Sequence, residues 1–187
     1  MMNQALVTII GRDRPGIVHQ VSQVLASQGC HILGLSQTTL LGQFTGTFSA
    51  KGPESLSLER LSEVLGQSLE GSSLSHWIAP PAEGYGQEAA PSEPYVITLR
   101  GPDRLDLIPE VTKTVASFEA NIDNLRAVAV TAGQDEEASP LVLVLEITVP
   151  VTVKQNVFRQ ALSLTAEELG IEISLQHRDI FEAIHRV

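Results

Sequence analysis

An internal repeat divides this sequence into two similar halves. The segment Gly11–Arg14 recurs as Gly101–Arg104, so an offset of 90 residues takes position 11 to position 101. A repeat of this length predicts two copies of one structural unit. The same offset aligns the apolar residues that follow without a gap, taking Ile17 to Leu107, Val21 to Val111, Ala26 to Ala116 and Ile32 to Ile122.

Both copies have the same predicted order of elements, strand–helix–strand–strand–helix–strand. Apolar residues three or four positions apart indicate the helices, and alternation of apolar and polar residues indicates the strands. In the first copy we expect strands over 5–10, 31–40, 43–50 and 74–78, and helices over 16–28 and 58–69. In the second we expect strands over 95–100, 122–130, 141–149 and 171–175, and helices over 107–118 and 154–169.

This order predicts an α+β protein of two ferredoxin-like βαββαβ modules, each an antiparallel four-stranded sheet with two helices on one face. We expect the first module over 1–79, a Pro- and Gly-rich linker over 80–94 and the second module over 95–178. The tail 179–187 is predicted to form a short helix that covers apolar surface. The second face of each sheet is left open.

Composition excludes several classes of function. The chain has 12 Lys and Arg against 22 Asp and Glu, a formal net charge of −10, which argues against direct nucleic-acid binding. The single cysteine, Cys30, excludes an internal disulfide and a multi-cysteine metal site, so we expect no metal and no cofactor. The sequence has no apolar run of membrane-spanning length and no basic-then-apolar signal at its start, so we expect a cytoplasmic protein without a membrane partner.

The best candidate segment for ligand binding is the loop Gly11–Val18, between the first strand and the first helix. Pro15 suits the first helical position, and Asp13 is placed to accept hydrogen bonds from first-turn amides. Gly11 and Gly16 leave room for a ligand to approach the backbone. Because a helix N-terminus presents free N–H groups, this loop suits an anionic group such as a carboxylate. The alternative is a well-capped turn that binds nothing.

The loop, the βαββαβ order and the tandem arrangement resemble the ACT-domain family of amino-acid-sensing modules. The segment Cys30–Gln37 is similar to the family's entry into its second strand, and Ala120–Leu125 is the second copy's version. Two modules without a catalytic domain resemble the family's glycine cleavage system transcriptional repressors. The resemblance implies modules that pair side by side, with an amino acid bound between the partners.

The resemblance also implies which residues contact a ligand. In the family these come from the first loop and from the start of the second strand. Carried onto this chain, they are Gly11, Arg12, Asp13, Arg14, Pro15, Gly16, Ile17, His31 and Ile32 in the first copy, and Asp103, Arg104, Asn121 and Ile122 in the second.

The two copies differ where the first helix begins. Pro15 and Gly16 become Leu105 and Asp106, which places a carboxylate where an anionic ligand group would sit. Asn121 keeps the amide that is common at its position in the family, whereas the first copy has His31. If only one loop binds an amino acid, we therefore expect it to be the first.

A non-enzymatic sensor is the function that these features favour. It would bind a small amino acid, resembling glycine or serine, at a module interface, and act as a homodimer through contact with a regulator protein, as a transcriptional co-regulator of glycine metabolism. No phosphate loop or Ser–His–Asp set indicates an enzyme. The main alternative is a protein-interaction module whose ligand pockets have degenerated. RNA binding needs exposed aromatic residues that the strand over 141–149 lacks, and a small hydrolase using a loop arginine lacks an identifiable partner group.

Overall fold

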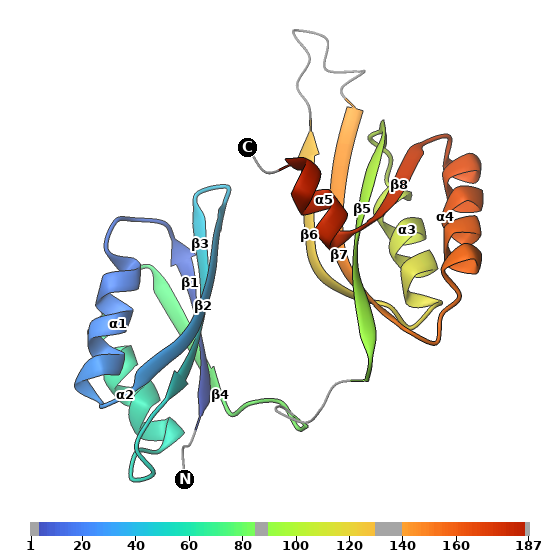
Figure 1. Cartoon of the computed structure of the whole chain (residues 1–187). Helices are drawn as coiled ribbons and strands as arrows, with labels where there is room; N and C mark the ends of the chain where they lie inside the picture. Colours follow the sequence, from blue (N-terminus) through green and yellow to red (C-terminus); the bar gives the residue numbers. More distant parts are fainter. Residues whose placement is uncertain (1–3, 85–89, 130–139, 186–187) are drawn as a thin grey trace, which may run out of the picture. The chain divides into compact units, whose positions relative to one another are not determined.

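The computed structural model describes residues 4–84, 90–129 and 140–185 (Figure 1). The chain divides into two compact units, residues 1–87 and 88–187. Each unit contains one copy of the repeat and one four-stranded sheet.

The first unit has the strand order β2-β3-β1-β4, and every neighbouring pair is antiparallel. Helices α1 and α2 lie on one face of this sheet (Figure 1). The elements are β1 (Ala5–Arg12), α1 (Ile17–Ser27), β2 (His31–Leu40), β3 (Gln43–Lys51), α2 (Leu58–Leu69) and β4 (Leu74–Ala79).

The second unit repeats this topology with the strand order β6-β7-β5-β8. Helices α3 and α4 lie on one face of the sheet, and a further helix, α5, follows the last strand (Figure 1). The elements are β5 (Ser92–Pro102), α3 (Leu107–Ala116), β6 (Asn121–Ala129), β7 (Pro140–Pro150), α4 (Gln155–Leu169), β8 (Glu172–His177) and α5 (Arg178–His185).

Each core lies between a sheet and its two helices, as the apolar spacing predicts. The first is built on Val7, Ile9, Val21, Leu25, Phe48, Leu61 and Leu65. The second is built on Ile97, Leu99, Val111, Val115, Leu145, Phe158 and Leu162. The predicted fold class, two ferredoxin-like modules, is therefore confirmed.

Turn residues fix where the first helix ends and where the first hairpin reverses. Gly29 has a φ of 71°, and the amide of Cys30 donates to the carbonyl of Leu25 over 2.9 Å, which closes the C-terminus of α1. Between β2 and β3, Leu41 and Gly42 have φ values of 50° and 75°. Two consecutive positive φ angles are typical of a tight two-residue hairpin turn.

The structure departs from the sequence predictions at several places. Pro15 is not the first helical residue, because α1 begins at Ile17 and Gly16 is its N-cap. Strand β5 begins at Ser92, inside the range expected as linker. The apolar pattern of the helix expected over 107–118 includes Ile108, yet this residue is exposed because the buried stripe of α3 runs through Leu107 and the residues four and eight positions later. The acidic segment Asp135–Glu137, between the strands expected over 122–130 and 141–149, lies outside the described residues.

Helix α5 covers the face of the second sheet opposite α3 and α4 (Figure 1). Val96 alternates with Tyr95 and Ile97, which face the helix-side core, so Val96 points to the opposite face, yet it is only 2% exposed. Arg178, at the start of α5, lies 3.6 Å from Asp123 and 4.0 Å from Glu146. This helix begins one residue before the range expected for the tail.

Candidate functional site

The first loop carries an arginine that has no carboxylate partner among the residues that the structure describes. Arg14 donates from Nη2 to Oε1 of Gln20 over 2.6 Å and from Nη1 to the carbonyl of Pro15 over 3.4 Å. Gln20 in turn donates to the carbonyl of Ser68 over 2.6 Å. Within the described parts of the chain, Arg14 forms no ion pair, so its exposed guanidinium is available to an anion.

Asp13 contacts the β2–β3 hairpin and not the helix. Its amide donates to the carbonyl of Gly42 over 2.9 Å, and its carboxylate accepts from the hydroxyl of Thr39 over 3.3 Å. The N-terminus of α1 has no side-chain cap. The prediction that Asp13 caps this helix is therefore wrong, and among the described residues no side chain caps the first-turn amides of α1.

The two glycines of the first loop differ in what surrounds them. A Cβ at Gly11 would lie 2.0 Å from the carbonyl oxygen of Ser73, so this glycine is required by close packing against the chain that enters β4. Gly101 holds the same position in the second copy, where a Cβ would meet Ile171 at 2.3 Å. Gly16 has a left-handed φ of 89° and open space around it, so ligand access remains there.

The predicted first-copy residues do not form one cluster. Strands β1 and β2 both pair antiparallel with β3, so Arg12 and Leu40 share the partner Gln43, whereas His31 pairs with Lys51. The loop after β1 and the start of β2 are therefore about 26 Å apart along β3. His31 and Ile32 lie at the end of the unit opposite Gly16.

Arg12 is also separated from the rest of its loop. By strand alternation, Gly11 lies on the helix side of the sheet and Arg12 on the open side. Its side chain is exposed. Of the first-copy candidates, Arg14, Pro15, Gly16 and Ile17 lie at the start of α1, whereas Asp13, next to Arg14, contacts the β2–β3 hairpin. Ile17 itself is buried in the core.

The second loop neutralises its own arginine. Arg104 donates from Nε and Nη2 to the two oxygens of Asp106 over 2.9 and 2.7 Å, and from Nη1 to the carbonyl of Leu169 over 3.1 Å. The hydrogen bond from Arg104 lowers the pKa of Asp106 below its ordinary value. Asp103 is exposed beside this pair. An anionic ligand would have to displace Asp106 to reach Arg104.

Residues at the start of β6, the second strand of this copy, also have hydrogen-bond partners within the module. Asn121 donates to Oδ1 of Asp123 over 2.7 Å, and Thr148 donates to Oδ2 of the same carboxylate. Arg178 of α5 pairs with Asp123, while Ile122 packs against the core. The amide of Asn121 is therefore part of the network that holds α5.

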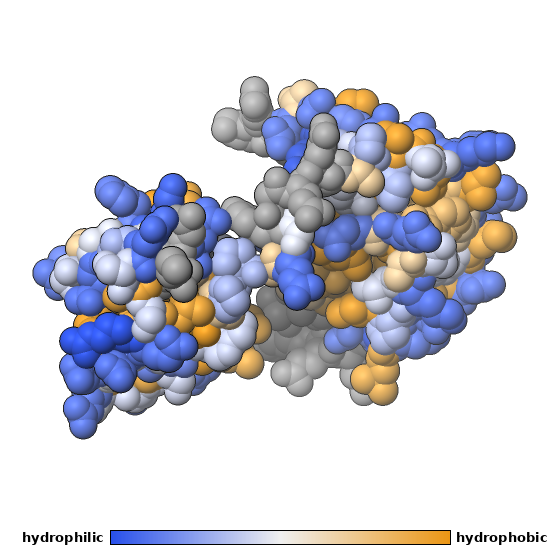
Figure 2. All heavy atoms as spheres, turned by 90° about the horizontal axis from the view of Figure 1, so that it is seen from below, coloured by the Kyte–Doolittle hydropathy of each residue, from blue (hydrophilic) through white to orange (hydrophobic). Residues whose placement is uncertain are grey.

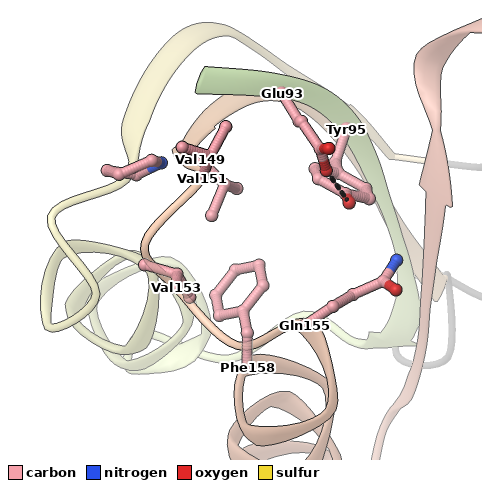
Figure 3. A pocket seen from close by; sticks show the side chains of 8 residues that line it. Glu93, Tyr95, Val149, Val151, Val153, Gln155 and Phe158 are labelled. Carbon is pink, nitrogen blue, oxygen red and sulfur yellow. Dashed lines mark hydrogen bonds between the residues drawn. The ribbon is translucent and has the colours of Figure 1, made fainter. Parts of the chain in front are cut away.

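A small cavity lies in the second unit between β5, the end of β7 and the start of α4 (Figure 3). Its volume is about 30 Å³, and Glu93, Tyr95, Val149, Val153 and Phe158 are among its lining residues. Tyr95 donates to Glu93 over 2.6 Å, and this hydrogen bond raises the pKa of the tyrosine. Such a space holds about one water molecule. The cavity is not an extension of the second loop, because Tyr95 in its lining is six residues from Gly101 along β5.

The described residues offer neither a cluster of metal-binding side chains nor a membrane-spanning helix. Within 4–84, 90–129 and 140–185, no group of three or more His, Cys, Asp or Glu side chains is placed to hold a metal ion. In the same ranges, no helix has the length and apolar character needed to cross a membrane. Burial raises the pKa of the Cys30 thiol, which disfavours the reactive thiolate.

Comparison with known proteins agrees with the ACT-type fold. The ACT-domain model matches residues 3–74. A UPF0237 protein of Methanococcus maripaludis is 30% identical over 95 residues, which cover 51% of this chain and 99% of the relative. The chain belongs to the ACT-domain family. The relative has the length of about half of this chain, as expected for one that corresponds to a single module.

Solved structures share the tandem arrangement of the two modules. A protein of unknown function from Galdieria sulphuraria superposes with a TM-score of 0.82 at 21% identity, covering 95% of this chain and 99% of that one. A candidate glycine cleavage system transcriptional repressor superposes with a TM-score of 0.72 at 16% identity, covering 94% and 97%. Both similarities show that the fold of two tandem four-stranded modules is shared by other proteins.

Sequence reasoning missed three residues around the loop of the first ACT module. Gln20 orients Arg14, Ser68 anchors Gln20, and Thr39 holds Asp13. Gln20 lies one turn into α1, on the side of its N-terminus, and this position could have been singled out. Ser68 and Thr39 come from elements distant in sequence, and only the packing of α2 and the hairpin against this loop brings them there.

Proposed function

We propose that this chain is a non-enzymatic regulatory protein that senses a small amino acid through the loop of its first ACT module. The observation that carries the proposal is the contrast between Arg14, which has no carboxylate partner among the described residues, and Arg104, which Asp106 neutralises. Arg14 and the free amides of α1 suit a carboxylate. Asp13 supplies a carboxylate for the ammonium group of the same amino acid.

The separation of the first-copy residues supports a site between partners. Every residue of β2 is exposed, so this edge strand is free to pair with another strand. If β2 pairs antiparallel with β2 of a second copy, the end of each strand lies beside the start of the other. His31 and Ile32 of one copy would then complete the loop of its partner, and ligand binding would stabilise the homodimer.

The output of the sensor is proposed to be contact with a regulator protein. Similarity to a candidate glycine cleavage system transcriptional repressor supports a role as a cytoplasmic co-regulator of glycine metabolism, with glycine or serine as ligand. The net charge of −10 supports action through protein rather than through nucleic acid.

Calorimetric titration with glycine and with serine tests the proposal. Wild type and Asp106→Ala are expected to bind equally, whereas Arg14→Gln, which leaves the backbone of the loop unchanged, is expected to weaken binding by about tenfold or more. Gly16→Asp is expected to abolish it, since the new carboxylate repels the ligand. Equal loss in Asp106→Ala and Arg14→Gln would refute the assignment to the first loop.

The alternative function is a protein-interaction module with degenerated pockets. The engagement of Arg104 by Asp106, and of Asn121 by Asp123, favours it for the second module. A bound ligand at about 100 times its Kd adds about 2.7 kcal/mol to stability. A melting screen against the twenty amino acids that gives no shift in wild type would favour this alternative for the whole chain.

A further inference from the structure

The open face of the first sheet differs from the covered face of the second in a way that identifies a docking surface. We define this surface as the side of the sheet opposite α1 and α2. Strand register assigns its residues, because directly paired residues of neighbouring strands point to the same side. They include Leu6, Thr8, Ile10, Arg12, Thr45, Thr47, Ser49, Lys51, Ser75, Trp77 and Ala79.

Large apolar side chains are exposed on this surface. Trp77 is 60% exposed, Ile10 51% and Leu6 37%. Figure 2 shows hydrophobic side chains reaching the surface between hydrophilic ones in each unit. Leu6 and Ile10 point to the same side on β1, and Trp77 pairs with Thr8 between them, so the three side chains form one patch. Exposed apolar patches that include tryptophan are typical of protein interfaces.

The second unit shows what covers an equivalent surface. The 90-residue offset takes Leu6 to Val96, and Val96 lies buried beneath the amphipathic helix α5. Arg178 anchors α5 through Asp123 and Glu146. In the first unit, Leu33 occupies the position of Asp123. Ser49 occupies the position of Glu146, because Ser49 pairs with Leu6 as Glu146 pairs with Val96. A second copy's α5 therefore lacks its anchors there.

The charge of the first surface determines what its partner must carry. Its strand positions contain no Asp or Glu, and Arg12 and Lys51 lie at opposite ends of the patch, near the ends of β1 and β3. A helix lying along the patch with acidic residues at its flanks would pair with both cations. A second copy bringing this same face would place Arg12 and Lys51 among like charges.

We propose that the open face of the first module is a docking surface for an amphipathic, acidic helix of a partner protein. Leu6, Ile10 and Trp77 receive the apolar side of that helix, and Arg12 and Lys51 pair with its acidic flanks. The surface is distinct from the loop around Arg14 and Gly16, and its test involves no amino acid ligand. The two proposals can therefore fail independently.

Trp77 is the chain's single tryptophan, so its fluorescence reports directly on this surface. The probes are two synthetic helical peptides of about 14 residues, or four turns, with the same leucine face and either glutamate or lysine elsewhere. The Leu/Glu peptide is expected to move the Trp77 emission to shorter wavelength and to protect it from acrylamide. The Leu/Lys peptide is expected to bind about tenfold more weakly, and added salt should reduce the difference.

Matched variants separate this surface from other exposed apolar positions. Ile10→Asp is expected to weaken the Leu/Glu peptide by about tenfold or more, because it places a carboxylate in the apolar patch. Leu164→Asp, at an exposed position of α4 in the second unit, is expected to bind as wild type does. Circular dichroism melting of both variants checks that they are folded.

Several results would overturn the proposal. Equal responses to the two peptides, no response to the Leu/Glu peptide at millimolar concentration, or equal loss in Ile10→Asp and Leu164→Asp would each do so. If Trp77 emission in the free protein shifts with protein concentration, the occupant is a second copy. If Trp77 is already protected in the dilute free chain, the surface is covered and unavailable.

Discussion

Arg104 binds Asp106 through two hydrogen bonds, 2.9 Å from Nε to Oδ1 and 2.7 Å from Nη2 to Oδ2. The duplicated positions in the first module are Arg14 and Gly16, where no such pair exists among the described residues. One loop of the repeat is therefore self-neutralised and the other is receptive to an anion. A single substitution, between glycine and aspartate, accounts for the difference.

The Arg104–Asp106 pair predicts a pH dependence. The hydrogen bond from Arg104 lowers the pKa of Asp106 in the folded protein. The pair therefore stabilises the fold at pH values above the unfolded pKa of about 3.9, and this stabilisation is lost as the pH falls through the folded pKa. Asp106→Asn is expected to melt slightly below wild type at pH 7, and the gap should close in acid. Melting curves across this range, with Asp103→Asn as control, check it; a gap that widens in acid would contradict it.

The glycines that begin the two loops predict unequal costs of adding a methyl group. In Gly11→Ala the new Cβ meets the backbone carbonyl of Ser73, whereas in Gly101→Ala it meets the side chain of Ile171, and a side chain shifts more readily than the backbone of a neighbouring strand. Gly101→Ala is expected to cost about 1–3 kcal/mol, the usual range for overpacking, and Gly11→Ala more. Denaturant unfolding measures both. Equal costs would mean that the β4 entry yields as readily as a side chain.

The N-terminus of α2 depends on one side chain. Ser57 accepts a hydrogen bond from the amide of Arg60 over 3.1 Å. Ser57→Ala is expected to destabilise the protein by about 1 kcal/mol, since a first-turn amide loses its partner. Ser27→Ala, at the exposed C-terminal end of α1, is the matched control and should cost less than about 0.5 kcal/mol. Thermal unfolding of the two variants tests this order.

Much of the fold follows from the sequence because one pattern repeats twice. The apolar spacing that predicts α1 is the spacing of its buried residues, Ile17, Val21 and Leu25. The prediction that Pro15 is the first helical residue is wrong. Proline is favoured at that position, but Gly16 adopts a left-handed φ, which the sequence pattern does not predict. Such backbone choices depend on what the loop packs against, here the β2–β3 hairpin.

The candidate site was harder to predict than the fold. Its residues were grouped by resemblance, but strand direction places His31 at the end of the sheet opposite Gly16. That separation follows from the shared antiparallel partner β3 and could have been derived from topology. The pairing of Asp106 with Arg104, and of Asp123 with Arg178, depends on side-chain conformations that spacing does not determine.

The attachment of α5 predicts a measurable, salt-dependent contribution from Arg178. Its side chain is 33% exposed, and Nη2 lies 3.6 Å from Asp123 and 4.0 Å from Glu146, so each pair is partly screened by solvent. Arg178→Ala is expected to cost about 1 kcal/mol and to speed amide hydrogen exchange in α5 and at Val96. Arg60→Ala breaks the exposed pair with Glu63 and should cost less than about 0.5 kcal/mol, with no change at Val96. Unchanged exchange at Val96 in Arg178→Ala would show that apolar contacts alone hold the helix.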